Sequence, residues 1–128
     1  MTHPNETVAR QVYEAFQTGD VDTLKGLVSP DVRWHEAGSP EVIQGREAVQ
    51  ARLGMVAGLE NDLELHTVLA DDDHVVSLVT ARLRKPNGDE VSYPVVEVVH
   101  VQDGMVTERW AFMDAVPPDV QAFFADLG

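Results

Sequence analysis

The chain contains no cysteine, so disulfide bonds, thiol catalysis and cysteine metal sites are excluded. Basic residues are scarce, with 9 Lys+Arg against 22 Asp+Glu and a formal net charge of −13. Nucleic acids and anionic membranes are bound through basic patches, so we expect no nucleic-acid partner and no membrane partner. No apolar run approaches the length of a membrane span, and the first residues do not resemble a signal peptide. A soluble, cytoplasmic protein is expected.

The 128 residues, of which 44% are hydrophobic, suit a single domain spanning residues 1–128. Helical periodicity predicts helices over Glu6–Thr18, Val21–Val28 and Gly45–Leu59, and a short helix over Asp119–Leu127. Gly19 suits a C-cap and Asp20 an N-cap.

A two-residue period replaces the helical one from Asp62 onward. Turn residues at Asp71–Asp73, Pro86–Gly88 and Asp103–Gly104 divide this half into an antiparallel meander. One short strand, Val32–Glu36, lies among the helices, after a break at Ser29–Asp31. The order of elements predicts an α+β fold.

Glu36 ends the short strand on the same face as Val32 and Trp34, because alternate strand residues share a face. Two readings follow from this position. The carboxylate is either a solvated strand end or a base at the mouth of an apolar pocket.

Glu97 lies mid-strand among valines and a tyrosine, where an unpaired carboxylate would be costly to bury. It either stays protonated or pairs with a cation, for which Arg109 on the next strand is the candidate. A three-residue turn at 102–104 sets Arg109 opposite Glu97, and a two-residue turn sets Trp110 there. General acid–base catalysis also uses pairs of carboxylates on apolar surfaces.

The strand Glu90–Val101 is apolar on both faces, whereas antiparallel strands usually have one polar face. Helices would cover one face. A second subunit would cover the other, so a homodimer through the outer sheet face is expected.

The segment Asp31–Glu47, DVRWHEAGSPEVIQGRE, resembles the matching segment of the nuclear transport factor 2-like superfamily. This superfamily includes ketosteroid isomerases, SnoaL-like polyketide cyclases, limonene-epoxide hydrolases and scytalone dehydratases. Gly19-Asp20, Gly45-Arg46-Glu47 and Asp103-Gly104 also fit its pattern. The resemblance implies a cone-shaped α+β barrel, with a curved mixed or antiparallel sheet wrapped by about three N-terminal helices. It also implies an apolar cavity and a dimer through the outer face.

The resemblance also implies roles for individual residues. The general base of ketosteroid isomerase falls on Glu36, and its protonated acid falls on Glu97 after a one-residue shortening of the following turn. Its oxyanion tyrosine falls on Val12, with Tyr13 adjacent. The epoxide-hydrolase pattern fits less well, because its last-strand carboxylate falls on Ala111.

We therefore name Glu36, Glu97 and Arg109 as candidate catalytic residues, with His35 and Asp114 as secondary candidates. Parity places His35 on the opposite face from Glu36. No histidine spacing suggests a metal site, and no cofactor is expected. The predicted pocket walls are Val12, Tyr13, Phe16, Trp34, Leu53, Val56, Tyr93, Val95, Val99, Ala111 and Met113.

These features favour a pocket for a small, largely apolar molecule, in which Glu36 removes a proton beside a carbonyl. Protonated Glu97, or Arg109, would stabilise the resulting enolate. The activity would be that of an isomerase, cyclase or dehydratase. The alternative is a non-catalytic domain for ligand binding, dimerisation or an accessory role, because fold does not fix function.

Overall fold

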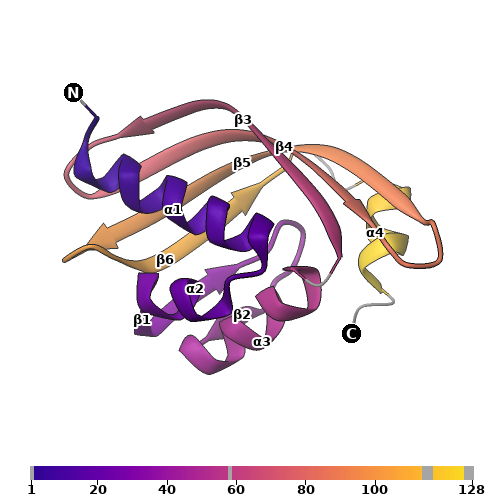
Figure 1. The fold of residues 1–128 in the computed structure, drawn as a ribbon, viewed down its shortest axis with the longest axis horizontal. Coiled ribbons are helices and arrows are strands. Elements are labelled where there is room, and N and C mark those ends of the chain that lie inside the picture. The colour runs from indigo at the N-terminus through magenta and orange to yellow at the C-terminus, as the bar shows by residue number, and fades with distance from the viewer. Residues whose placement is uncertain (1, 58, 114–116, 126–128) are drawn as a thin grey trace.

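The computed structural model describes residues 2–57, 59–113 and 117–125. These residues form four helices and six strands (Figure 1). In chain order they are α1 (Pro4–Thr18), α2 (Val21–Leu27), β1 (Val28–His35), β2 (Val42–Gln44), α3 (Arg46–Ala57), β3 (Glu60–Ala70), β4 (His74–Arg84), β5 (Glu90–Gln102), β6 (Met105–Phe112) and α4 (Pro118–Ala125). The predicted α+β class is confirmed, and each predicted helix is present with boundaries shifted by a few residues.

The turn between α1 and α2 forms as its sequence predicts. Gly19 ends α1 with φ 71°, a left-handed conformation that glycine adopts without steric cost. Its amide donates to the carbonyls of the last turn of α1. Asp20 then caps α2, because its side chain accepts a hydrogen bond from the Thr23 amide. These two caps reverse the chain so that α2 packs beside α1.

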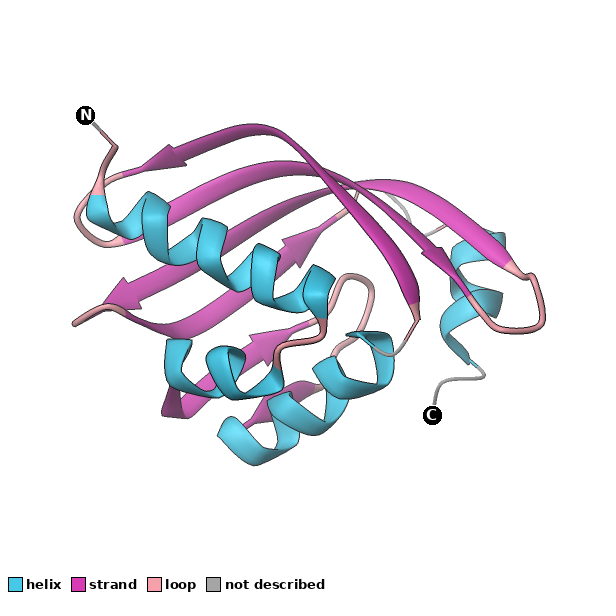
Figure 2. Ribbon diagram, in the orientation of Figure 1, coloured by secondary structure: helices cyan, strands magenta, loops and turns pink. Residues whose placement is uncertain are grey.

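The strands form one curved, open sheet in the order β2-β1-β6-β5-β4-β3 (Figure 2). The sheet is mixed: β1 pairs with β6 in parallel, and all other neighbours are antiparallel. The second helix ends at Leu27, just before the predicted stop at Ser29–Asp31, but β1 begins already at Val28, earlier than the predicted Val32. Pro30 falls where the β1–β6 pairing is irregular, between Val28 and Arg33. Proline is tolerated there because no ladder hydrogen bond is required of it.

Neither predicted register of the last hairpin is correct. The turn is the two-residue one, with Gln102 opposite Met105. The register then shifts between His100 and Val101, so that Glu97 lies opposite Ala111 and Arg109 lies opposite Val99. Such a shift is a β-bulge, which inserts one unpaired residue in one strand. It leaves Glu97 and Arg109 diagonal to each other on the same face.

The helices cover one face of the sheet, which we call the inner face (Figure 2). Its side chains form the hydrophobic core with the helices, around fully buried residues such as Val32, Val49 and Val79. The opposite, outer face has no helix over it in the described part of the chain. No helix in the described residues is long and apolar enough to cross a membrane.

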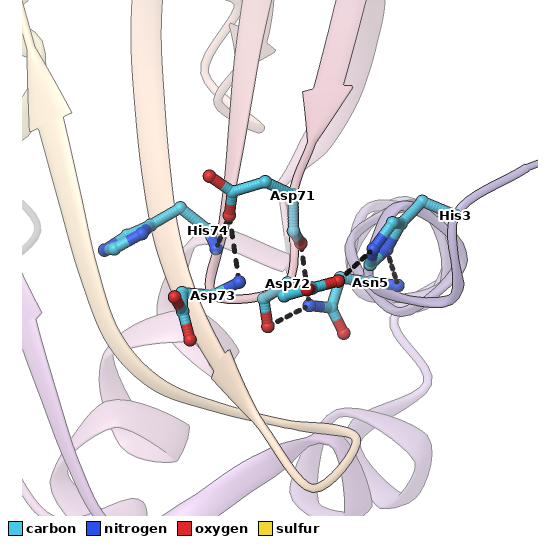
Figure 3. A network of polar contacts seen from close by, with 6 residues as sticks. All are labelled: His3, Asn5, Asp71, Asp72, Asp73 and His74. Atoms are coloured by element: carbon cyan, nitrogen blue, oxygen red, sulfur yellow. Dashed lines mark hydrogen bonds and ion pairs between the residues drawn. The ribbon is translucent and has the colours of Figure 1, made fainter.

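The start of α1 is tied to the β3–β4 turn (Figure 3). His3 accepts a hydrogen bond from the Asn5 amide through Nδ1, and its Nε2 lies 3.1 Å from Oδ1 of Asp72. Asn5 donates to the carbonyls of Asp71 and Asp72. The Asp71 carboxylate accepts from the amides of Asp73 and His74, which fixes the turn and lowers the Asp71 pKa. The acidic turn is therefore a structural clamp for α1.

Candidate functional site

A cavity of about 590 Å³ lies between the inner face of the sheet and helices α1, α3 and α4. This volume falls within the range of sites for small molecules. Most of its wall is apolar, and the charged side chains in it are Glu36, Arg52, Glu97 and Arg109. All the predicted wall residues line it except Val99, which packs into the core beside the cavity.

The cavity has further walls that the sequence did not indicate. The β1–β2 loop contributes Ala37, Gly38 and Ser39, while α4 contributes Val120, Gln121 and Phe124. Leu24, Leu63, Ala81 and Leu83 complete the lining together with Arg52.

Glu97 is held by an arginine and a tyrosine. Nε and Nη2 of Arg109 lie 2.8 and 2.5 Å from Oε2 of Glu97, and the Tyr13 hydroxyl donates to Oε1 at 3.2 Å. Both side chains of the ion pair are largely buried, at 13% exposure for Glu97 and 14% for Arg109. Of the two alternatives for Glu97, the structure contains the ion pair. Glu97 is an acceptor in all three of these hydrogen bonds.

Arg109 is fixed by two further contacts. Its Nη1 donates to the carbonyl of His35 at 3.2 Å, and its guanidinium lies 4.7 Å from the centre of the Trp34 ring. The carbonyl is at the end of β1, and the ring contact is a cation–π interaction. The parallel pairing of β1 with β6 brings these groups together, with Trp34 opposite Arg109.

Glu36 also has an arginine partner. Nε of Arg52 lies 3.0 and 3.2 Å from its two carboxylate oxygens. This pair is more open than the first, with Glu36 31% exposed and Arg52 18% exposed. Parity correctly places Glu36 with Trp34 on the cavity side. The sequence reading missed Arg52, although it shares a helical stripe with Val49, Leu53 and Val56, which is a signal for an inward position.

Val12, on which the family's oxyanion tyrosine falls, has no hydroxyl, but its neighbour Tyr13 brings one to the site. Val12 lines the cavity, and Tyr13 carries its hydroxyl to Glu97. Burial, and next the negative charge of Glu97, raises the pKa of Tyr13 far above its ordinary value. Tyr13 is therefore a proton-bearing donor in this network.

The secondary candidates do not join the cavity in the described structure. His35 lies on the outer face, where Nε2 is 2.6 Å from Glu108 and the ring stacks on Trp110 at 5.6 Å. Asp114 lies outside the described residues. In the described part of the chain, no group of three or more histidine or carboxylate side chains is placed to hold a metal ion.

The sequence of residues 9–109 matches the model of the SnoaL-like domain. The chain belongs to the SnoaL-like family. This family is part of the nuclear transport factor 2-like superfamily that the sequence resembles. No curated protein matches the chain.

Solved structures share the SnoaL-like fold at low sequence identity. One is an LEH-like epoxide hydrolase from Mycobacterium tuberculosis, with 22% identity, a TM-score of 0.77, and coverage of 87% of this chain and 83% of that one. A second M. tuberculosis protein, in complex with estradiol-17β-hemisuccinate, has 15% identity, a TM-score of 0.81 and coverage of 88% and 95%. The Δ5-3-ketosteroid isomerase of a Mycobacterium species has 14% identity, a TM-score of 0.80 and coverage of 88% and 95%. These similarities establish the fold.

Proposed function

We propose that this SnoaL-like domain binds a small, largely apolar molecule in its cavity and moves a proton beside a carbonyl group of that molecule. The reaction class is that of a cofactor-independent isomerase, cyclase or dehydratase. The observation that carries the proposal is an apolar cavity of about 590 Å³ that contains two carboxylates, each held by an arginine. One structural relative binds a steroid derivative, which fits an apolar guest.

Glu36 is the proposed general base. It is the more exposed of the two carboxylates, and Arg52 holds both of its oxygens from one side. A base must lie within hydrogen-bond reach of the proton it removes, and a fixed carboxylate at the cavity wall meets this need.

Arg109 is the proposed group that stabilises the enolate oxygen. An arginine has five N–H donors. In Arg109, one donor on Nε and one on Nη2 bind Glu97, and one on Nη1 binds the His35 carbonyl. The remaining donors are available to a ligand oxygen. Glu97 and Tyr13 then act as positioning residues that hold the guanidinium in place. A fixed positive group near a developing oxyanion stabilises the transition state.

The second candidate function is ligand binding without catalysis. Both carboxylates are paired with arginine, and such ion pairs also occur where they only stabilise a structure. This pairing favours the second function. A binding measurement does not separate the two functions, whereas the proton-exchange experiment on Glu36 described in the Discussion does.

Both candidate functions require a ligand bound in the cavity, so filling the cavity tests this shared requirement. In the Ala81→Phe variant a ring replaces a methyl group on the cavity wall, so we expect at least about a tenfold loss of affinity for a steroid such as 17-hydroxyprogesterone. The matched control is Ala51→Phe, because Ala51 is exposed on α3. Calorimetry measures the affinity, and circular dichroism checks the fold. Unchanged binding to a folded Ala81→Phe variant would place the ligand elsewhere.

The outer face is the proposed dimer interface. Cross-strand pairing aligns apolar side chains in rows, Leu78–Val96–Phe112 and Val76–Val98–Trp110. Leu78 and Phe112 are 43% and 54% exposed, and apolar patches of this kind mark interaction sites.

A charge in the middle of this face is expected to separate the subunits. We expect the wild-type protein to sediment as a dimer and Leu78→Glu to sediment as a monomer, because each dimer would bury two added carboxylates. Met55→Glu is the matched control, since Met55 is 49% exposed on α3. A wild-type monomer at micromolar concentration in analytical ultracentrifugation would show that the outer face is not a dimer interface.

A further inference from the structure

Tyr93 is a polar group in the cavity for which the proposed reaction has given no role. It lies on the inner face of β5, four residues before Glu97, and lines the cavity. Its partner across the β4–β5 ladder is Ala81, whose small side chain leaves room for the tyrosine ring. The ring makes an edge contact with Phe124 of α4 at 6.0 Å. The ring is therefore held against α4.

The hydroxyl of Tyr93 differs from that of Tyr13. The Tyr13 hydroxyl donates to Glu97, whereas the Tyr93 hydroxyl makes no hydrogen bond within the part of the chain that the structure describes. Buried tyrosine hydroxyls normally find a partner. Tyr93 lines the cavity, so a group that enters the cavity can accept from its hydroxyl.

Tyr93 lines the same cavity as both ion pairs. Burial, and next the charge of Glu97, raises the pKa of Tyr93 to about 12, and the charges of Arg109, Glu36 and Arg52 also act on it. All four charged groups of the cavity thus lie within electrostatic reach of one phenol. At neutral pH this phenol keeps its proton and is a hydrogen-bond donor in the cavity that also contains Glu36 and Arg109.

We infer that the Tyr93 hydroxyl donates a hydrogen bond to the carbonyl oxygen of the ligand. This inference rests on the proposed function, and it adds the residue that distinguishes ketones and esters from hydrocarbons. A carbonyl is favoured over a carboxylate, because the four charged groups of the cavity carry no net charge and the whole chain carries −13. Tyr93 is thus a specificity-determining residue that positions the carbonyl between Glu36 and Arg109.

Two probes of the same shape test the inference. 2-Acetylnaphthalene has a carbonyl oxygen where 2-isopropylnaphthalene has a methyl group, and both are small enough for the cavity. We expect the wild-type protein to prefer the ketone, and Tyr93→Phe to lose about three- to tenfold in affinity for the ketone alone. Calorimetry measures both affinities.

The carbonyl stretch of bound, ¹³C-labelled 2-acetylnaphthalene reports the hydrogen bond directly. We expect a lower frequency in the wild-type protein than in Tyr93→Phe, because donation to the oxygen weakens the C=O bond. Thr80→Val is the control, since it removes a hydroxyl of the same sheet that pairs with His66 outside the cavity, and it should keep the wild-type frequency.

The outcomes separate the inference from the proposed function. If both probes bind equally, or if Tyr93→Phe keeps the ketone preference and the frequency, the inference is wrong and the apolar pocket remains. If neither probe binds the wild-type protein at millimolar concentration, the proposed function and the inference both fall.

Discussion

The variant Arg109→Met is expected to lose about 3–5 kcal/mol of unfolding free energy, the usual cost of removing one partner of a buried ion pair. The loss arises because Glu97, which is only 13% exposed, would lose its cation partner and keep only Tyr13 as a hydrogen-bond donor. The Trp34 contact of the guanidinium would be lost as well. Urea denaturation measures the change.

The double variant Glu97→Gln/Arg109→Met separates the buried charge from simple loss of packing. The side-chain amide of the new glutamine would carry no charge, and its oxygen would still accept from the Tyr13 hydroxyl. We therefore expect the double variant to be more stable than Arg109→Met by roughly 2 kcal/mol, because replacing both partners of a buried pair is far less costly than removing one.

Arg82→Met is the matched control for the arginine. Arg82 pairs with Asp62 on the neighbouring strand at 2.9 Å, with side chains 57% and 61% exposed. Exposed pairs contribute about 0–1 kcal/mol. Equal destabilisation by Arg82→Met and Arg109→Met, or a double variant no better than the single one, would contradict the description of Glu97 as a buried charge that needs Arg109.

Features that depend on neighbouring residues in the chain were predictable from the sequence. Gly19 and Asp20 reverse the chain through local backbone geometry, and strand parity groups Glu36 with Trp34 and Glu97 with Tyr93, all of which line the cavity. Parity also places His35 on the outer face. Each of these depends on a period or a cap that is complete within a few residues.

Features that depend on distant pairing were not predictable. The bulge beyond the last hairpin turn decides which residue faces Glu97, and no turn signal encodes it. Strand β2 has three residues, which is too short to show a period, and its existence depends on pairing with β1. The Glu36–Arg52 pair depends on how α3 docks beside the β1–β2 loop. Sequence patterns thus indicated the carboxylates of the cavity but not all of their partners.

Glu36→Gln is expected to lower proton exchange by about 10²–10⁴-fold, the usual contribution of a general base. The reaction to follow is exchange of the methyl protons of 2-acetylnaphthalene in D₂O, because removal of a proton beside a carbonyl is the step proposed for this cavity. Proton NMR measures the exchange rate above that of buffer.

Glu41→Gln is the matched control for this reaction, because Glu41 is an exposed carboxylate shortly after Glu36 in the chain. It should keep the wild-type rate, whereas Glu36→Asp, which shortens the reach by one methylene, should fall between wild type and Glu36→Gln. Full exchange by Glu36→Gln would show that Glu36 is not the base. Binding of the ketone with no exchange above buffer in the wild-type protein would favour the non-catalytic function, since the cavity would then hold a carbonyl without activating it.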